Sequence, residues 1–200
     1  FDPAEIARTY AAAGAACLSV LTDVSYFQGA DENISLAKSV CALPVLRKDF
    51  IVDRYHLFEA AAGGADAVLL NVAVLNDRQL ADFRSQALEL DLDCLVEVHD
   101  EAELDRALEA DAEIIGINTR NLDTGVVDVA TTYELMPDVP AGKTVVSESG
   151  ISQRAELVEL ERVGVDAALI GETLMRAADP EAKVRELTGS GDVTSEHFLP

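Results

Sequence analysis

Polar residues recur in this sequence at the points where short, strongly apolar segments end. Four such segments, at 43–48, 94–98, 114–118 and 144–150, end in or beside charged or amide residues, and helix-like sequence follows each of them. In a barrel built from alternating strands and helices, catalytic groups lie at the C-terminal ends of several strands and meet at one mouth. The pattern therefore predicts an α/β protein of the (β/α)8 barrel type, and it favours an enzyme.

The alternation of apolar runs and helix-like segments extends along most of the chain. Seven runs are apolar almost throughout, which is typical of parallel strands covered on both faces; they lie at 15–21, 43–47, 65–70, 93–98, 113–118, 144–148 and 167–171. Helices are predicted at about 2–13, 32–41, 53–64, 77–90, 100–109, 130–136, 152–163, 172–177 and 180–187. A loop is expected around Tyr26, and Ser152 is expected to cap the helix that follows it.

Seven strands are one fewer than a closed eight-stranded barrel contains, and the chain opens with helix-like sequence where such a barrel opens with a strand. The expected explanation is a first strand that lies upstream of Phe1. On this basis residues 1–187 are interpreted as a partial barrel domain. Residues 188–200, which are acidic and rich in Gly and Ser, are predicted to form a flexible tail.

Composition narrows the classes of partner. The formal net charge of −22 argues against general nucleic-acid binding, since phosphate backbones require a basic surface. No apolar run approaches the roughly 18 residues of a membrane span, and no secretory leader pattern opens the chain. A cytoplasmic protein with a small-molecule substrate and no membrane partner is expected. Cys17, Cys41 and Cys94 are predicted to be buried free thiols, and no Cys or His spacing indicates a metal site.

The excess of acidic residues, 37 Asp and Glu against 15 Lys and Arg, has two interpretations. One is a salt-adapted (halophilic) surface, on which hydrated carboxylates keep the protein soluble while high ionic strength screens their mutual repulsion. The other is an ordinary acidic cytosolic enzyme. The halophilic interpretation is favoured here. Because lysines are so few, Lys48 at a predicted strand end is conspicuous.

Four motifs stand at the ends of predicted strands: Leu46-Arg-Lys-Asp-Phe50, Leu95-Val-Glu-Val-His99, Gly116-Ile-Asn-Thr-Arg-Asn-Leu122 and Val146-Ser-Glu-Ser-Gly-Ile151. Taken together and in this order, they resemble the indole-3-glycerol phosphate synthase family, and the resemblance runs from Phe1 to about residue 187. It implies a (β/α)8 barrel carboxy-lyase of tryptophan biosynthesis. The implied reaction converts 1-(2-carboxyphenylamino)-1-deoxyribulose 5-phosphate to indole-3-glycerol phosphate, releasing carbon dioxide and water without a metal or an organic cofactor. Other enzymes of the pathway are the protein partners to consider.

The resemblance also implies roles for the strand-end residues. Ring closure needs a proton donor at the substrate carbonyl, and Lys48 matches the family's lysine in that role. Glu97 matches a glutamate that serves as general acid and base in dehydration, and a carboxylate in a partly dry barrel mouth can exchange protons near neutrality. Asn118 matches a residue that orients polar groups of the substrate. The expected catalytic set is Lys48, Glu97, Asn118 and Ser149.

Two further sets are expected to bind the substrate. The substrate-binding set is Arg120, Glu148, Phe50 and Leu122, and the phosphate-binding set is Gly150, Gly171 and Glu172. Phe50 and Leu122 match residues that line the family's aromatic-ring pocket, although core packing would explain them equally. Glu148 either pairs with a lysine or holds a substrate hydroxyl. The phosphate is expected after the last two strands, where glycines and a short helix offer backbone N–H groups.

One motif of the family, Glu-x-Lys followed by Ser-Pro-Ser in the first strand, is absent from these 200 residues. It supplies a second catalytic lysine, a glutamate and a phosphate-binding serine, so the 200 residues alone are not expected to turn over substrate. One alternative is therefore an inactive or non-catalytic phosphosugar-binding barrel fragment. Another is a phosphoribosylanthranilate isomerase, which would need a cysteine at the end of its first strand. His56, His99 and His197 are expected to have structural or surface roles.

We expect stability to rise with salt. The excess carboxylates repel one another at low ionic strength, and molar salt shortens the Debye length to about 3 Å. Thermal melts over a range of potassium chloride concentrations measure the effect, and a rising melting temperature is expected. A melting temperature that stays flat or falls would favour the ordinary acidic enzyme.

Overall fold

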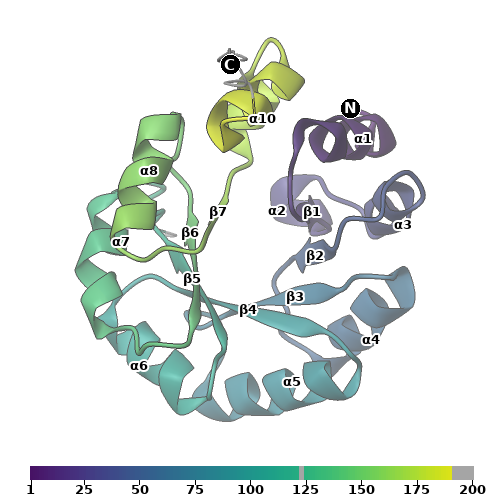
Figure 1. Ribbon diagram of the computed structural model, residues 1–200. Helices are drawn as coiled ribbons and strands as arrows, with labels where there is room; N and C mark the ends of the chain where they lie inside the picture. Colours follow the sequence, from purple (N-terminus) through teal and green to yellow (C-terminus); the bar gives the residue numbers. More distant parts are fainter. Residues whose placement is uncertain (122–123, 191–200) are drawn as a thin grey trace, which may run out of the picture.

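Seven parallel strands form one curled sheet with helices on its outer side (Figure 1). The computed structural model describes residues 1–121 and 124–190. Each strand pairs with the next one in chain order, so the sheet runs from β1 to β7. The strands are β1 (Leu18–Leu21), β2 (Val45–Lys48), β3 (Ala67–Asn71), β4 (Asp93–Val98), β5 (Ile114–Asn118), β6 (Thr144–Glu148) and β7 (Ala167–Leu169). This is the α/β architecture that the alternation predicts.

Helices connect the strands and cover the outside of the sheet (Figure 1). They are α1 (Pro3–Ala13), α2 (Val24–Phe27), α3 (Glu32–Lys38), α4 (Arg54–Gly63), α5 (Asp77–Glu89), α6 (Glu101–Glu109), α7 (Ala130–Leu135), α8 (Arg154–Arg162), α9 (Glu172–Arg176) and α10 (Pro180–Thr188), with a 3₁₀ turn at Met136–Asp138. Local capping explains their boundaries. At the start of α1, for example, the Asp2 carboxylate accepts the N–H groups of Ala4 and Glu5, and Pro3 occupies the first turn.

Three local predictions are wrong. The segment around Tyr26 is a short helix, α2, rather than a loop, because the Asp23 side chain accepts the Tyr26 N–H and caps it. Gln153 rather than Ser152 is the capping residue of α8, and it forms a capping box with Glu156.

The third concerns the cysteines, which are free as expected but are not all buried. Cys94 is buried, Cys41 is partly buried and Cys17 is exposed. Cys17 directly precedes β1, an edge strand with a neighbour on one side, which explains its exposure. In the part of the chain that the structure describes, no helix has the length and apolar character needed to cross a membrane. The tail predicted at 188–200 lies mostly outside the described residues, and α10 extends to Thr188.

The inner and outer faces of the sheet carry different side chains, and this division places the site. Three leucines form a small buried cluster of their own, apart from the main core: Leu46, Leu69 and Leu95. Side chains alternate between the two faces of a strand. The residues two positions further along, Lys48, Asn71 and Glu97, therefore point to the same face as the leucines. Each of these strands thus offers an apolar residue to the interior and then a polar residue at its C-terminal end.

Arg47 lies on the opposite face of β2 from Lys48. Its side chain is 4% exposed, donates from Nε to Thr22 Oγ1 (3.1 Å), and lies 3.1 Å from an Asp49 oxygen and 3.0 Å from an Asp31 oxygen. Asp31 directly precedes α3. Arg47 therefore joins the ends of β1 and β2 to the start of α3, and it fixes the backbone from which Lys48 projects.

The tripeptides Gly64-Ala-Asp66 before β3 and Gly164-Val-Asp166 before β7 are similar and have the same structural use. The Asp66 carboxylate accepts the Val45 N–H at the start of β2 (2.7 Å), and the Asp166 carboxylate accepts the Val145 N–H at the start of β6 (2.8 Å). Each aspartate thus joins the start of its strand to the start of the preceding strand. Both contacts lie at the N-terminal ends of the strands, away from Lys48 and Glu97.

The sheet is open between β1 and β7, whereas the helical layer is closed there. Within the described residues, β1 pairs with β2 alone and β7 pairs with β6 alone. Outside this opening α1 packs against α10, and the contact includes a small cluster of Ala13, Val184 and Leu187 (Figure 1). Within the described residues, each of the two edge strands therefore has one side without a strand partner.

We expect the 200 residues expressed on their own to self-associate, because open strand edges template pairing between chains. Gel filtration with light scattering, over a range of protein concentrations, measures this. Ala167→Lys places a charge on the exposed edge strand β7 and should shift the chain toward monomer, whereas Ala81→Lys on the exposed face of α5 should not. A concentration-independent monomer in the unsubstituted chain would contradict the expectation.

Candidate active site

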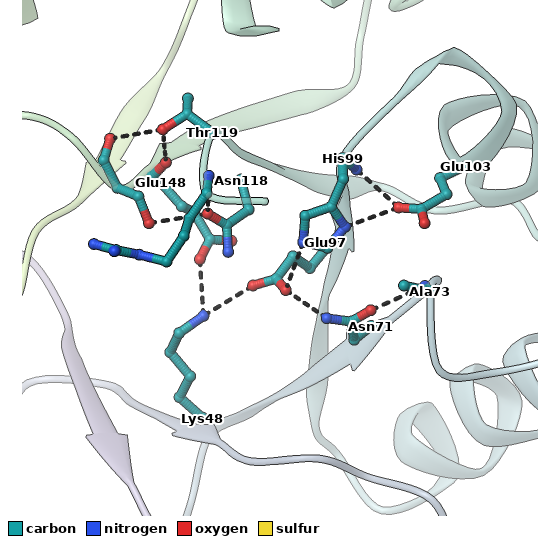
Figure 2. A network of polar contacts seen from close by, with 11 residues as sticks. Lys48, Asn71, Ala73, Glu97, His99, Glu103, Asn118, Thr119 and Glu148 are labelled. Atoms are coloured by element: carbon teal, nitrogen blue, oxygen red, sulfur yellow. Dashed lines mark hydrogen bonds and ion pairs between the residues drawn. The ribbon is translucent and has the colours of Figure 1, made fainter. Parts of the chain in front are cut away.

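Lys48 lies between two buried carboxylates at the C-terminal end of the sheet (Figure 2). Its Nζ atom is 2.9 Å from Glu97 Oε2 and 2.9 Å from Glu148 Oε2. The three side chains come from β2, β4 and β6, and they are 20%, 3% and 1% exposed, respectively. In barrels of this kind, inward side chains from alternate strands share one layer. The structure thus brings together three of the residues that the sequence indicated, and it gives Glu148 a lysine partner.

Two neighbouring residues make this arrangement fit. Gly116 on β5 leaves room for Glu148, because a Cβ atom at position 116 would overlap the Glu148 carboxylate. Asn71 at the end of β3 donates from Nδ2 to Glu97 Oε1 (2.6 Å) and accepts the Ala73 N–H at Oδ1 (2.9 Å). Asn71 was not among the predicted site residues. Its signal in the sequence is the one used elsewhere, a polar residue directly after an apolar run.

The three charges shift one another's protonation. Burial lowers the pKa of Lys48, but Glu148 and Glu97 outweigh burial and hold this pKa above its ordinary value. Burial alone would raise the pKa of Glu97, but His99 and Lys48 outweigh it and hold this pKa well below its usual range. For Glu148, burial is the main cause that raises the pKa to about 7, and the charge of Glu97 adds to it. One lysine therefore compensates one of the two carboxylates fully, and the other titrates near neutrality.

The second oxygen of Glu148 agrees with this assignment. Glu148 Oε1 is buried and has no hydrogen-bond partner among the described residues. An ionised carboxylate oxygen without a partner in a dry site is costly, whereas a protonated oxygen is far less so. The surroundings of Glu148 Oε1 therefore favour the neutral carboxyl, as the burial of this side chain does.

Asn118, at the end of β5, and Ser149, directly after β6, form a second polar pair. Asn118 Oδ1 accepts the Ser149 hydroxyl (2.9 Å) and the Arg120 N–H (3.0 Å). The Thr119 hydroxyl lies 3.1 Å from the backbone carbonyl oxygen of Glu148 and 3.2 Å from that of Ser149. Ser149 has a φ of 71°, a left-handed conformation that costs a non-glycine residue roughly 1–2 kcal/mol. Such strained residues cluster at functional sites.

The glycines assigned to phosphate binding lie at neighbouring loops. Gly150 has a φ of 77°, and a Cβ atom there would collide with two valine side chains of the loop after β5, so the position requires glycine. Gly171 directly precedes α9. The Thr173 hydroxyl in α9 donates to the carbonyl oxygen of Ile151 (2.6 Å), which joins the two loops.

Arg120 and Glu172 pair across the same side of the mouth. Arg120 Nη2 is 3.0 Å from Glu172 Oε2, and Arg176 Nε is 3.0 Å from Glu172 Oε1. The Glu172 carboxylate is therefore occupied by two arginines, and what it can offer to an anion is its backbone N–H.

An aromatic cluster is centred on Phe50, which follows Lys48 by two residues in the chain. The Phe50 ring is 5.8 Å from the Tyr26 ring in an edge-to-face arrangement and 6.0 Å from the Phe27 ring in a stacked one. Tyr26 and Phe27 are 78% and 47% exposed, which is unusual for such large apolar side chains. Phe50 was predicted from the sequence, whereas the two α2 residues were not assigned to the site. The predicted ring-pocket residue Leu122 lies outside the described residues.

The opposite end of the sheet also has a hollow, but it is not part of this site. It has a volume of about 540 Å³ and lies at the starts of β5 and β6. Its charged residues pair with their neighbours, as Lys143 does with Asp111 (3.6 Å). Across residues 1–121 and 124–190, no group of three or more His, Cys, Asp or Glu side chains is arranged to hold a metal ion.

A family model described as indole-3-glycerol phosphate synthase matches residues 1–187 of this chain. The chain belongs to this family. The indole-3-glycerol phosphate synthase of Bordetella pertussis is 52% identical over 187 residues, which cover 94% of this chain and 71% of that protein. That of Laribacter hongkongensis is 52% identical over 188 residues, with coverages of 94% and 72%. This is a carboxy-lyase family of tryptophan biosynthesis. Lys48, Glu97 and Glu148 therefore meet at the strand ends of a member of that family.

Solved structures with similar folds confirm the barrel architecture. They bear on nothing beyond the fold, because their sequences are only distantly similar to that of this chain. A 3-hexulose-6-phosphate synthase has a TM-score of 0.74 at 17% identity, with 94% of this chain and 93% of that chain covered. A thiamine phosphate pyrophosphorylase from Pyrococcus furiosus has a TM-score of 0.70 at 18% identity, with coverages of 93% and 87%.

We expect Glu148→Gln to remove a pH-dependent loss of stability. The pKa of Glu148 rises from 4.5 to about 7 on folding, so its stabilising contribution is complete below pH 4.5 and is lost as the pH rises through 7. At about 1.4 kcal/mol per pKa unit, the rise from 4.5 to about 7 corresponds to a loss on the order of 3–4 kcal/mol. Urea denaturation between pH 4.5 and 8 should show that the free energy of unfolding of the parent chain falls relative to that of the variant.

The matched control for this prediction is Glu109→Gln, at an exposed position at the end of α6. Its pH profile should run parallel to that of the parent chain. Parallel profiles for Glu148→Gln as well would contradict the raised pKa of Glu148.

Proposed function

We propose that this chain carries most of the active site of an indole-3-glycerol phosphate synthase. Its substrate would be 1-(2-carboxyphenylamino)-1-deoxyribulose 5-phosphate, a small molecule with a phosphosugar and an aromatic acid. The observation that carries this proposal is the Lys48 ammonium held between Glu97 and Glu148 at the strand ends. These three side chains lie in a chain that belongs to the indole-3-glycerol phosphate synthase family.

The charge states of Lys48 and Glu97 fit the chemistry. Ring closure forms a bond from the aromatic carbon to the ketone carbon, and the ketone oxygen takes up a proton. Lys48, with its raised pKa, is an ammonium that can donate that proton. Carbon dioxide then leaves, which restores the aromatic ring. The new hydroxyl finally leaves as water, which needs a proton at the hydroxyl and a base for the proton on the neighbouring carbon. Glu97, with its lowered pKa, is ionised and can serve as that base.

Other groups complete the proposed binding site. The rings of Phe50, Tyr26 and Phe27 offer an apolar surface beside Lys48 for the aromatic ring of the substrate. Leu122 is retained as a ring-pocket residue on the sequence resemblance alone. Asn118 and Ser149, hydrogen-bonded to each other, would orient substrate hydroxyls.

The phosphate is proposed to bind at the loops of Gly150 and Gly171, with the backbone of Glu172. Glycines there let the backbone approach an anion closely. Arg120 is the nearby positive group, and its side chain is 39% exposed. A substrate anion would compete with Glu172 for it.

The opening between β1 and β7 is proposed to hold one more strand. The helical layer is already closed outside it by the contact of α1 with α10, so the vacant place is inside the barrel. A strand with the family's Glu-x-Lys and Ser-Pro-Ser motif would supply the second lysine and the phosphate-binding serine. The alternative is an inactive phosphosugar-binding barrel, which the absence of that motif from these 200 residues favours. The Lys48, Glu97 and Glu148 network favours the enzyme.

Two further proposals concern the setting of the protein. We propose a cytoplasmic, salt-adapted enzyme, because salt screens the repulsion among the carboxylates of a chain with a net charge of −22. Contacts with other enzymes of tryptophan synthesis are also proposed, on the resemblance alone.

We expect Lys48→Ala and Glu97→Gln, made in the full-length protein, to lower kcat at least roughly 100-fold, the usual scale for a general acid or base. Indole fluorescence after addition of the carboxyphenylamino-deoxyribulose phosphate measures turnover. The control is Lys143→Ala, at the opposite end of the sheet, which should keep kcat. Near-normal rates for both site variants would refute the assigned roles, and a parent protein without turnover would support the inactive barrel.

A further inference from the structure

His99 is a partly buried titratable residue beside Glu97 that the proposed chemistry does not use. Its side chain is 14% exposed, and its Nε2 atom is buried without a hydrogen-bond partner among the described residues. That atom lies 3.4 Å from Glu97 Oε1 (Figure 2). The sequence interpretation gave this histidine a structural or surface role. The geometry indicates more, because a buried unpaired ring nitrogen faces the carboxylate proposed as the base.

Glu103 fixes the orientation of the His99 ring. Glu103 Oε2 accepts the backbone N–H of His99 (2.8 Å) and lies 2.8 Å from the ring atom Nδ1 (Figure 2). Glu103 stands in the first turn of α6, where the Asp100 side chain accepts its N–H. A carboxylate oxygen accepts hydrogen bonds, so Nδ1 carries a proton. The other ring nitrogen, Nε2, is thereby directed at Glu97.

This orientation couples the charges of His99 and Glu97. A neutral ring protonated at Nδ1 would aim the Nε2 lone pair at a carboxylate, which is repulsive. An imidazolium instead aims an N–H at Glu97 Oε1, which is attractive. Burial lowers the pKa of His99, but Glu103 and Glu97 outweigh burial and raise it to about 9. The charged groups that face the ring are Glu97 from β4 and Glu103 from α6, with Lys48 beyond Glu97.

The two oxygens of Glu97 consequently have different surroundings. Oε1 accepts from Asn71 and faces His99, whereas Oε2 accepts from Lys48. Both partners of Oε1 belong to the protein and are buried. Oε2 is therefore the oxygen left to face the substrate once Lys48 turns to the ketone.

We propose that His99, oriented by Glu103, is a positioning residue for the reaction: its imidazolium keeps Glu97 ionised and leaves Oε2 as the reactive oxygen. This role rests on the proposed function of Glu97 as the base. It does not require His99 to touch the substrate.

The kinetic test is the pH profile of kcat/KM for His99→Gln and Glu103→Gln in the full-length protein. An adjacent opposite charge shifts a carboxyl pKa by about 1–3 units. His99→Gln should therefore move the acidic limb of the profile upward by about one unit or more, with kcat lowered and KM changed little. Glu103→Gln keeps an acceptor for Nδ1 and should shift the limb less. His56→Gln, a histidine on α4 away from Glu97, should leave it unchanged.

A second measurement is independent of activity. Nitrogen NMR of ¹⁵N-histidine-labelled protein reports the protonation of each ring nitrogen, with His56→Gln and His99→Gln for assignment. His99 should be an imidazolium at pH 7 and lose a proton near pH 9. Glu97→Gln should lower that midpoint. A neutral His99 ring at pH 7, or an unshifted acidic limb in a folded His99→Gln protein, would overturn the proposal. A parent protein that makes no indoleglycerol phosphate but has a charged His99 would overturn the proposed function alone.

Discussion

The Lys48 ammonium lies between two buried carboxylates, and the charge of the whole site depends on that placement. A buried charge is tolerated when it is paired and hydrogen-bonded. One ammonium cannot compensate two carboxylates, so Glu148 is displaced toward its neutral form. Glu97 stays ionised because His99 supplies a second positive group on its other side. The site therefore contains an ammonium, an ionised carboxylate and a carboxyl with a pKa of about 7 within one layer of the barrel.

The barrel separates stabilising contacts from chemistry along the direction of its strands. At the N-terminal ends, Asp66 and Asp166 join neighbouring strands through backbone N–H groups. In the middle, leucines fill the interior. At the C-terminal ends, polar side chains replace the leucines on the same face. Solved structures of other phosphate-related enzymes share this architecture at 17–18% identity, so the fold by itself does not determine the activity.

Much of the fold follows from the sequence, because its local signals are strong. Apolar runs of strand length, alternating with helix-like segments, correctly predict the seven parallel strands and nearly all of the helices. Exceptions were local: Asp23 caps a short helix where a loop was expected, and Gln153 takes the capping position expected for Ser152. Such caps depend on which of several neighbouring polar side chains reaches the free N–H groups, and composition does not decide that.

The sequence by itself determined that Lys48, Glu97, Asn118 and Glu148 stand at strand ends, because each lies at or near the end of an apolar run. It could not say which strand-end residues face inward. Strands buried on both faces lack the polar–apolar alternation that reveals a face. Only the tertiary structure placed Lys48 inside and Arg47 outside, joined Glu97 to Asn71 and His99, and put Glu148 against Gly116. The physical reason is that these contacts cross between strands, and the curl and register of the sheet set the distances.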